Sequence, residues 1–267
     1  MINIAIPSYQ RPNNVLTLNN IPLSYKDNTY LFVRPEEYEL YKHYETQAKI
    51  VQLKNCTNIG DTRQYIAEYF DGKKMWMLDD DIKIFNSFYN QEKDIIRTDK
   101  NTIDEIQFYE CISYIEQILE HHYHGNLRFR IFPRGKSYWP YKINTYGYTN
   151  TFLNLEKINI KDINYNHMTL CEDMYVFLSL IKKGYSGVCV SRYMVDTGPP
   201  NSKGGCSTYR TIESHNAALD KINMLFPQYT IIKKKAYSLN LPGNEPLKAI
   251  IVRIKLKPSS NNLDEFF

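Results

Sequence analysis

Three consecutive carboxylates, Asp79, Asp80 and Asp81, directly follow an apolar run that ends at Leu78. Because each negative charge repels the next and the apolar run is expected to be buried, such a cluster is unfavourable unless a positive group lies beside it. Hard divalent cations such as Mg²⁺ and Mn²⁺ prefer carboxylate oxygens and often share their coordination shell with substrate phosphates. The cluster therefore indicates a site for Mg²⁺ or Mn²⁺ that carries a phosphorylated ligand. The simpler alternative is a solvated polar turn after a strand.

Polar segments at 7–12 and 58–63 are also expected near the carboxyl ends of strands, where ligands bind in doubly wound sheets. They supply a tight turn with a hydroxyl group, an aromatic ring that can stack on a base, and two guanidinium groups that can bind phosphate with paired donors. The residues concerned are Pro7, Ser8, Tyr9, Arg11 and Arg63. Each one alone is more often an ordinary loop or surface residue, so the inference depends on their joint appearance at successive strand ends.

Glu172 and Asp173 lie at the start of a helix predicted over residues 172–183. Acidic residues are common there because they complement the helix dipole. The functional alternative is a general base, since a carboxylate held near a hydroxyl group can take its proton as the hydroxyl attacks. Taken alone, the pair favours the structural role.

A loop rich in glycine, proline and serine contains Lys203, Gly204 and Gly205. Glycines allow backbone N–H groups to approach a phosphate closely, and Lys203 and Arg210 add positive charge. A phosphate-binding lid and a plain surface loop are equally compatible with this pattern. His215, in the next predicted helix, is a candidate third metal ligand, although a lone helical histidine is more often structural.

The elements that must position these residues alternate between strand and helix in the first half of the chain. This alternation predicts an α/β fold with a mainly parallel central sheet and helices on both faces. The predicted strands are 2–6, 29–33, 48–53, 74–78, 127–132, 146–153, 185–190 and 249–256. The predicted helices, besides 172–183, are 13–20, 35–44, 61–70, 102–124 and 210–225.

The strongest amphipathic pattern begins at Thr102 and closes with three histidines. Thr102 is the predicted N-cap, and Glu105 completes a capping box. His121, His122 and His124 are expected to complement the helix dipole or to meet solvent, in preference to binding a metal.

The composition is that of a soluble globular protein. With 267 residues, 43% of them hydrophobic, we expect a single domain over 1–258 and a frayed tail over 259–267. The net charge of +4 permits an anionic partner without requiring one. Five scattered cysteines without a CxxC pair indicate reduced thiols in a cytoplasmic protein. No segment resembles a signal peptide or a bilayer span, so no membrane association is expected, and nothing indicates the oligomeric state.

Taken in order, these motifs resemble those of a GT-A glycosyltransferase related to family 2. The similarity extends over residues 1–190 and rests on 6–12, 58–63, 77–82 and the Glu172–Asp173 pair. More narrowly, residues 33–41, the triple aspartate, Glu172–Asp173 and Gly204–Gly205 resemble the TET/JBP-associated glycosyltransferases. Those enzymes are found largely in phages and are thought to place sugars on hydroxymethylated pyrimidines.

The resemblance implies a Rossmann-like GT-A fold and a metal-dependent, inverting transfer of a hexosyl or pentosyl unit from a UDP-sugar. It implies Mn²⁺ or Mg²⁺ on Asp81 and Asp79 in a DXD motif, with His215 as a third ligand. Asp173 would be the catalytic base, with Glu172 as neighbour and possible substitute. Where many relatives carry a histidine before this pair, the chain has Cys171, so no role carries over. The implied donor-binding residues are Pro7, Ser8, Tyr9, Arg11, Arg63, Asp79, Asp80, Lys203, Gly204 and Gly205.

The implied acceptor is DNA with hydroxymethylated bases, met in the host cytoplasm if the protein is viral. Cations and aromatic residues mix over 128–141, and Lys233–Lys235 add charge, which suits phosphate contact and base stacking. A core strand with a tyrosine-rich loop, and a solvated charged face, are the structural alternatives. Two other functions remain open: transfer to a polysaccharide or protein, and a non-catalytic nucleotide- or DNA-binding module on the same scaffold.

Overall fold

The computed structural model of this chain describes residues 1–90, 95–130, 141–147, 149–197, 204–234, 241–243 and 245–254. Some sequence predictions fall outside these residues: the donor contact of Lys203, most of the aromatic and basic stretch at 131–140, Lys235, the end of the strand predicted over 249–256, and the tail at 259–267.

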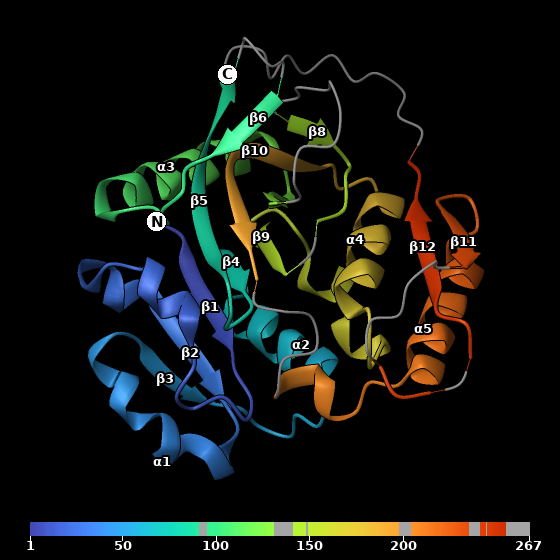
Figure 1. Ribbon diagram of the computed structural model, residues 1–267, viewed down its shortest axis with the longest axis horizontal. Helices are drawn as coiled ribbons and strands as arrows, with labels where there is room; N and C mark the ends of the chain where they lie inside the picture. Colours follow the sequence, from blue (N-terminus) through green and yellow to red (C-terminus); the bar gives the residue numbers. More distant parts are fainter. Residues whose placement is uncertain are drawn as a thin grey trace.

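A large mixed sheet forms the centre of the molecule (Figure 1). Its strands are β1 (Asn3–Pro7), β2 (Thr29–Val33), β3 (Lys49–Gln52), β4 (Lys74–Leu78), β5 (Lys83–Asn90), β6 (Ile95–Thr98), β7 (His124–Phe129), β8 (Tyr141–Ile143), β9 (Asn150–Asn154) and β10 (Gly187–Asp196). Their order is β3-β2-β1-β4-β9-β7-β10-β5-β6, and β8 pairs with β10. The neighbours from β3 to β4 are parallel, as are β7 and β10, while β9 and β5 run in the opposite direction. The predicted mainly parallel sheet is confirmed, with antiparallel strands inserted in its second half.

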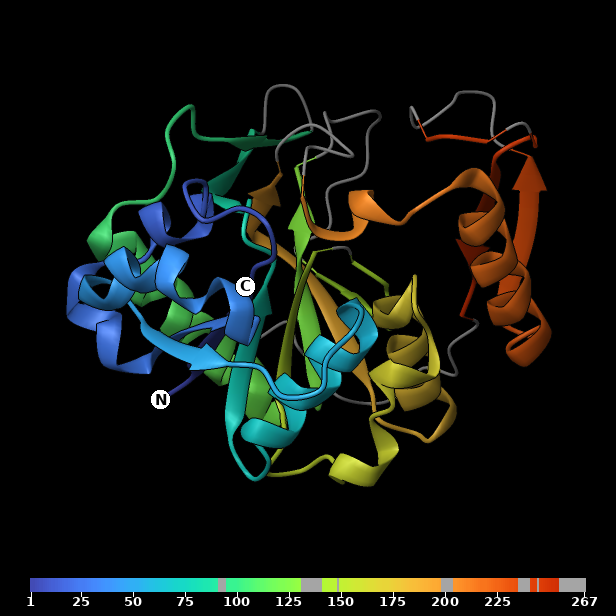
Figure 2. The ribbon, with the colours of Figure 1, turned by 90° about the horizontal axis from the view of Figure 1, so that it is seen from below.

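Helices cover both faces of this sheet, as predicted (Figure 2). They are α1 (Tyr38–Tyr41), α2 (Ile59–Tyr69), α3 (Glu105–His121), α4 (Glu172–Lys182) and α5 (Ile212–Leu225). Short 3-10 helices occupy Leu16–Asn20, Leu23–Asn28, Pro35–Glu37, Lys42–Thr46, Ile160–Asp162, Tyr165–His167 and Gly205–Thr208. Successive side chains of β1 point to opposite faces of the sheet, and each face is covered by a different helix. Ile4 and Ile6 belong to the same core cluster as Phe108 of α3, whereas Ala5 belongs to that of Ile66 of α2.

The helix predicted over 102–124 is shorter at both ends. Its N-cap is Asp104, not Thr102, and the capping box is completed by Gln107, whose backbone N–H donates to the Asp104 carboxylate at 2.9 Å. His122 and His124 lie beyond its last residue, and both are buried rather than solvated. Burial lowers the pKa of each to about 4, so these histidines are neutral core residues.

Several elements were not predicted from the sequence or differ from their predicted bounds. The strands β5, β6, β8 and β11 (Thr230–Lys234) were not predicted, and the helix expected over 13–20 is a 3-10 helix confined to Leu16–Asn20. The strand expected over 146–153 begins only at Asn150, after a loop in which Asn144 and Thr149 have positive φ angles.

The C-terminal elements pack outside α4 (Figure 1). Strands β11 (Thr230–Lys234) and β12 (Lys248–Val252) form an antiparallel pair beside α5. Asn216 of α5 accepts a hydrogen bond from the backbone N–H of Lys248 at 2.9 Å, which fixes β12 to the helix. All five cysteines are free thiols, as expected. Among the described residues, no helix combines the length and apolar character needed to cross a bilayer.

Candidate active site

The carboxyl ends of β1 and β4 lie side by side because the two strands are parallel neighbours. They open onto a cavity of about 640 Å³ that also borders α2, α4, α5 and β12. Every predicted site residue within the described part of the chain lines it: Pro7, Ser8, Tyr9, Arg11, Arg63, Asp79, Asp80, Asp81, Glu172, Asp173, Gly204, Gly205 and His215. The tertiary fold therefore brings together motifs that are widely separated in the sequence.

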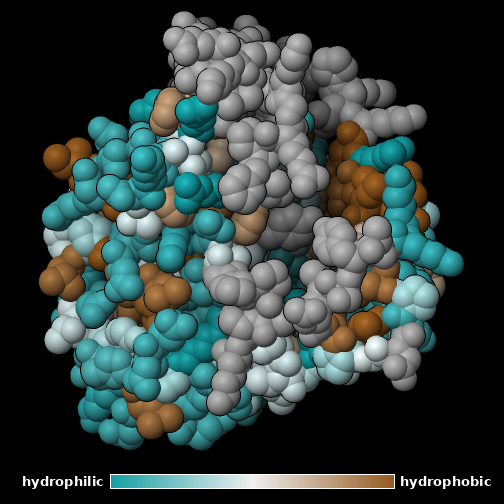
Figure 3. Space-filling model, in the orientation of Figure 1, coloured by the Kyte–Doolittle hydropathy of each residue, from teal (hydrophilic) through white to brown (hydrophobic). Residues whose placement is uncertain are grey.

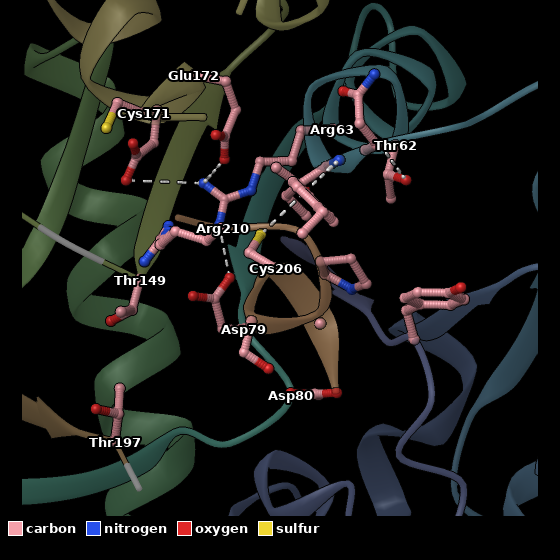
Figure 4. Close-up of a pocket in the computed structure, with 18 of the residues that line it drawn as sticks. Thr62, Arg63, Asp79, Asp80, Thr149, Cys171, Glu172, Thr197, Cys206 and Arg210 are labelled. Carbon is pink, nitrogen blue, oxygen red and sulfur yellow. Dashed lines mark hydrogen bonds and ion pairs between the residues drawn. The ribbon is translucent and has the colours of Figure 1, made fainter. Parts of the chain in front are cut away.

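Arg63 lies at the centre of the acidic groups (Figure 4). Its Nη2 atom is 2.6 Å from Asp79 Oδ1, and its Nη1 atom is 3.3 Å from Glu172 Oε1 and 3.9 Å from Asp173 Oδ2. The residue is only 7% exposed. Burial alone would lower the pKa of Arg63, but the three carboxylates raise it well above its usual value. This guanidinium group links the triple aspartate to the pair at the start of α4.

The placement of Arg63 follows from the start of α2. Asn58 is the N-cap, and its side-chain oxygen accepts the backbone N–H of Asp61 at 3.1 Å. Gly60 lies on the first turn, where an added Cβ would be 2.2 Å from the backbone oxygen of Met168. The absence of a side chain at this position lets α2 approach the segment before α4, and Arg63 thereby reaches both sets of acids.

Burial also changes the acids around Arg63. It raises the pKa of Asp79 to about 6, against the opposing effect of Arg63. It raises the pKa of Glu172 to about 7, again with Arg63 opposing and Asp173 adding to the rise. A carboxylate whose pKa lies near neutrality is suited to exchanging protons at physiological pH.

A second arginine, Arg11, lies beside the negative charges of Asp80 and Asp81. Arg11 Nη1 is 2.5 Å from Asp80 Oδ1 and 3.3 Å from Asp81 Oδ2, and Ser8 donates its hydroxyl proton to Asp80 Oδ2 at 2.6 Å. The Tyr41 hydroxyl accepts the Arg11 backbone N–H at 2.9 Å. Asp80 therefore holds the loop after β1 in place. The alternative of a solvated polar turn is wrong, because Asp80 is only 5% exposed.

Tyr9 and the glycine pair form the far side of this loop. The guanidinium carbon of Arg34 lies 3.8 Å from the centre of the Tyr9 ring. Gly205 donates its backbone N–H to the Tyr9 carbonyl at 3.1 Å, and a Cβ on Gly204 would lie 2.8 Å from Arg11 Cγ. The two glycines thus allow their loop to pack directly on the residues after β1.

Asp173 is held by contacts that the sequence did not reveal. The Tyr146 hydroxyl donates to Asp173 Oδ2 at 2.6 Å, and the backbone N–H of Met174 donates to Oδ1 at 2.8 Å. Tyr146 comes from an irregular loop, so no periodicity or motif could have identified it. Cys171, which precedes the pair, has a left-handed φ of 58° and makes no side-chain cap.

The predicted nucleic-acid stretch is only partly described. Arg130 lies over the Phe85 ring, with its guanidinium carbon 4.0 Å from the ring centre, and its Nη1 is 4.0 Å from Asp196. Arg128 is half-buried on β7, and burial lowers its pKa. These two positions agree with the core-strand alternative.

The donor set is compatible with a hard cation. Within the part of the chain that the structure describes, no three His, Cys, Asp or Glu side chains are grouped so as to hold a metal ion. Mg²⁺ and its relatives, however, commonly bind through one or two carboxylates while phosphates and waters complete the shell. Asp81 lines the cavity with its side chain 17% exposed, and Asp79 is its neighbour in the same turn. His215 lines the cavity from α5, and its metal role stays a prediction.

A mixed sheet whose strand ends carry an Asp-Asp-Asp turn beside an arginine-bridged Glu–Asp pair agrees with the GT-A resemblance of the sequence. The chain belongs to the TET-Associated Glycosyltransferase family, which matches residues 2–205. It is 37% identical over its full length to a Beta-glucosyl-HMC-alpha-glucosyl-transferase of Enterobacteria phage T6, covering 97% of that protein. The corresponding protein of Enterobacteria phage T2 is 36% identical with the same coverage.

Solved structures show similarity at low sequence identity. S. aureus TarS matches 75% of this chain and 61% of its own, with 12% identity and a TM-score of 0.47. Glucosyl-3-phosphoglycerate synthase from Mycobacterium tuberculosis matches 95% of this chain and 87% of its own, with 7% identity and a TM-score of 0.47.

Proposed function

We propose that the protein transfers a glucosyl unit from a UDP-sugar to modified hydroxymethylcytosine (HMC) in DNA. The observation that carries this proposal is the full-length similarity to two phage enzymes whose names specify α-glucosyl transfer to β-glucosyl-HMC. An acceptor of that kind already carries one glucose. The proposal therefore narrows the expectation of a hydroxymethylated pyrimidine to a base that has been glucosylated once.

The nucleotide would bind at the end of the cavity formed by β1 and β4. Tyr9 presents an aromatic ring there, with Arg34 over it, and Ser8 and Arg11 lie at the carboxylates of the triple aspartate. An arginine held by carboxylates can exchange them for phosphate oxygens, since both accept paired guanidinium donors. This chemistry supports a nucleoside diphosphate as the group that is bound.

Asp81 and Asp79 would hold Mn²⁺ or Mg²⁺, which supplies positive charge to the diphosphate leaving group. Within the chain itself, Arg63 keeps Asp79 and the Glu172–Asp173 pair at fixed separations through its two Nη atoms. The donor site and the proton-accepting site are therefore positioned by one side chain.

Asp173 is the proposed proton acceptor for the attacking hydroxyl group. Both its oxygens accept hydrogen bonds, from Tyr146 and from the backbone of Met174, so its orientation is fixed. Glu172 is more deeply buried, with a side chain 6% exposed against 18% for Asp173. The more accessible carboxylate is the better placed to meet an acceptor, while Glu172 balances the charge of Arg63.

The stereochemical outcome is the point where two expectations differ. The sequence resemblance implied inversion. The relatives are named for an α-glucosyl product, which from a donor with α-linked glucose means retention. The anomeric configuration of the product, measured by proton NMR, decides between them, and retention would remove the need for Asp173 as a base for attack from the opposite face.

The acidic groups lie at the floor of the cavity, and Glu172 and Arg63 are each less than one-tenth exposed. A base that stays stacked in a duplex presents only its groove edge. The acceptor glucose must therefore extend from the groove into the cavity, or the nucleotide must leave the stack.

The proposal is tested by incubating the protein with Mn²⁺, a panel of nucleotide sugars, and DNA containing HMC with and without β-linked glucose. We expect a disaccharide-bearing nucleoside, detected by mass, only from the glucosylated DNA with UDP-glucose. Transfer to a glycan or protein but to no DNA would contradict the proposal, and donor binding without any transfer would favour the non-catalytic alternative.

Asp81→Ala tests the metal site in the same assay. Because one of the proposed carboxylate ligands is lost, we expect Mn²⁺-dependent binding of the UDP-sugar to weaken by about 100-fold, measured by calorimetry with and without chelator. Donor binding that is equally strong without metal in both proteins would exclude a metal role for this residue.

A further inference from the structure

Five cationic side chains other than histidine line the cavity, and four of them have partners. Arg11 and Arg63 pair with the acids of the site, Arg34 stacks on an aromatic ring, and Lys248 pairs with a surface carboxylate. Arg210 differs, because within the described residues no carboxylate lies within ion-pair distance of its guanidinium group. The donor site as described above makes no use of it.

Arg210 is half-buried, and its Nε atom is shielded from solvent without a hydrogen-bond partner in the described part of the chain. A buried donor without an acceptor is unfavourable, because it has lost its hydrogen bonds to water without gaining new ones. Its backbone is nevertheless fixed, since its N–H donates to the Cys206 carbonyl at 3.0 Å. The Arg210 side chain can therefore donate a hydrogen bond to a bound ligand.

Arg210 lies near Cys206 and near Cys171, which directly precedes the Glu172–Asp173 pair. Burial raises the pKa of the thiols of Cys171 and Cys206, and Arg210 opposes that rise at both. Figure 4 shows Arg210 beside Cys206, between Cys171 and Asp79. The guanidinium group is thus close to where an acceptor must meet Asp173.

Beyond Arg210, the cavity is bounded by a wall that we call the α5–β12 wall. It consists of His215, Leu219, Lys248, Ala249 and Ile250. It contains no acidic side chain among the described lining residues, and Figure 3 shows apolar surface gathered over β12. A largely apolar wall beside an arginine suits a nucleotide, whose base and sugar have apolar faces and whose phosphate is anionic.

We propose that Arg210 and the α5–β12 wall form the acceptor subsite, in which Arg210 binds a backbone phosphate beside the modified nucleotide of DNA. This inference rests on the proposed transfer to DNA and adds the place at which the DNA backbone is held. It predicts that Arg210 distinguishes a DNA acceptor from the same modified nucleoside without phosphates.

The test compares wild type, Arg210→Ala and Arg210→Lys with UDP-glucose and Mn²⁺. The two acceptors are duplex DNA containing β-glucosyl-HMC and the free β-glucosyl-HMC nucleoside. In Arg210→Ala we expect kcat/KM for DNA to fall about 10- to 100-fold, as for a lost hydrogen bond to a charged group, but less than about 3-fold for the nucleoside. Arg210→Lys keeps the charge but loses the paired donors, so its kcat/KM for DNA should lie between the values of wild type and Arg210→Ala.

Salt dependence provides a second measurement. In a plot of log KM for DNA against log salt concentration, the slope for Arg210→Ala should be smaller than that of wild type by about 0.9, which corresponds to one phosphate contact. Arg34→Ala is the matched control at the opposite end of the cavity. It should raise KM for UDP-glucose and affect transfer to DNA and to the nucleoside equally. Thermal unfolding of each variant confirms that the fold is kept.

Weaker UDP-glucose binding by Arg210→Ala, or an equal loss with both acceptors, would assign Arg210 to the donor and overturn the inference. Unchanged kinetics with DNA would overturn it as well. Wild-type protein that transfers to no DNA would remove the proposed function and this inference together, so the wild-type reaction alone tells the two failures apart.

Discussion

At the scale of single residues, the site depends on how two arginines share five carboxylates. Arg63 contacts Asp79 and the Glu172–Asp173 pair, whereas Arg11 contacts the other two aspartates. A buried ion pair is costly to break, because the partner left behind is an uncompensated buried charge. The two arginines therefore offset part of the cost of burying the triple aspartate, although burial still raises the pKa of Asp79 and Asp80. Substrate phosphates would compete with the carboxylates for Arg11.

Asp173→Asn separates proton transfer from binding. The amide keeps the size of the carboxylate but cannot accept the proton, so we expect kcat to fall about 10²- to 10⁴-fold while calorimetry shows normal donor binding. Glu172→Gln is the matched comparison from the adjacent position. If Asp173→Asn kept most of its activity, Glu172 or the substrate itself would be the proton acceptor.

The pH profile tests the charge of Glu172. Burial raises its pKa to about 7, so the group is neutral below that pH and negative above it. We expect kcat to rise with pH through this value, because only the ionised group balances Arg63 and leaves Asp173 free to accept a proton. In Glu172→Gln that limb of the profile should disappear. A wild-type profile that is flat across neutrality would contradict this assignment.

At the scale of elements, the loop that carries Gly204 and Gly205 depends on close packing. Gly204 has a φ of 98°, and an added Cβ would lie 2.8 Å from Arg11 Cγ and 3.1 Å from the Gln10 carbonyl oxygen. The glycine is needed both for its backbone conformation and for the space beside it. A side chain there would displace the loop after β1 that contains the donor residues.

Gly204→Ala and Gly184→Ala separate these two effects. Gly184 has a similar φ of 90° but no atom within 4 Å of an added Cβ, so its substitution measures backbone strain alone. Both variants should lose about 1–3 kcal/mol of stability in urea unfolding. Only Gly204→Ala should also raise the donor KM, by roughly 10-fold, through displacement of Arg11. Equal donor KM values for the two variants would show that the loop does not position Arg11.

At the scale of the whole molecule, stability should depend on the protonation of His124, which is buried between β7 and α4. His124 is 2% exposed, contacts the Tyr185 carbonyl at 3.2 Å and lies against Phe177. Burial lowers its pKa to about 4 from an ordinary value of 6.5. The unfolded chain therefore binds a proton at a pH where the folded protein does not.

The sign of the effect follows from this difference. The stabilisation is complete above the unfolded pKa of 6.5 and is lost as the pH falls towards 4, by about 3 kcal/mol in all. His124→Gln should be less stable at neutral pH but should lose less stability across that interval, measured by urea unfolding at a series of pH values. His121→Gln, at an exposed neighbour, is the control and should behave as wild type. An unchanged slope in His124→Gln would mean that this residue does not titrate as described.

The sequence by itself determined the elements whose signal is local. Apolar runs predicted β2 and β4 at their observed bounds, and the acidic start with the following apolar pattern predicted α4. Alternating strands and helices also fixed the direction of the first four sheet strands, because parallel neighbours require crossovers. The convergence of the strand-end motifs followed from that topology, and the resemblance to a glycosyltransferase family is confirmed.

Only the tertiary structure decided which charges meet. Arg63 contacts Asp79 and Glu172, and Tyr146 reaches Asp173 from a loop without periodicity. Strand β5 joins the central sheet through β10, which lies about a hundred residues later in the chain, so its place in the sheet leaves no local signal. Local patterns record which side chains prefer burial, but pairings between distant segments exist only once the chain has folded back on itself. The different surroundings of Arg63, which contacts three carboxylates, and of Arg210, which has no carboxylate within ion-pair distance among the described residues, are a consequence of that folding.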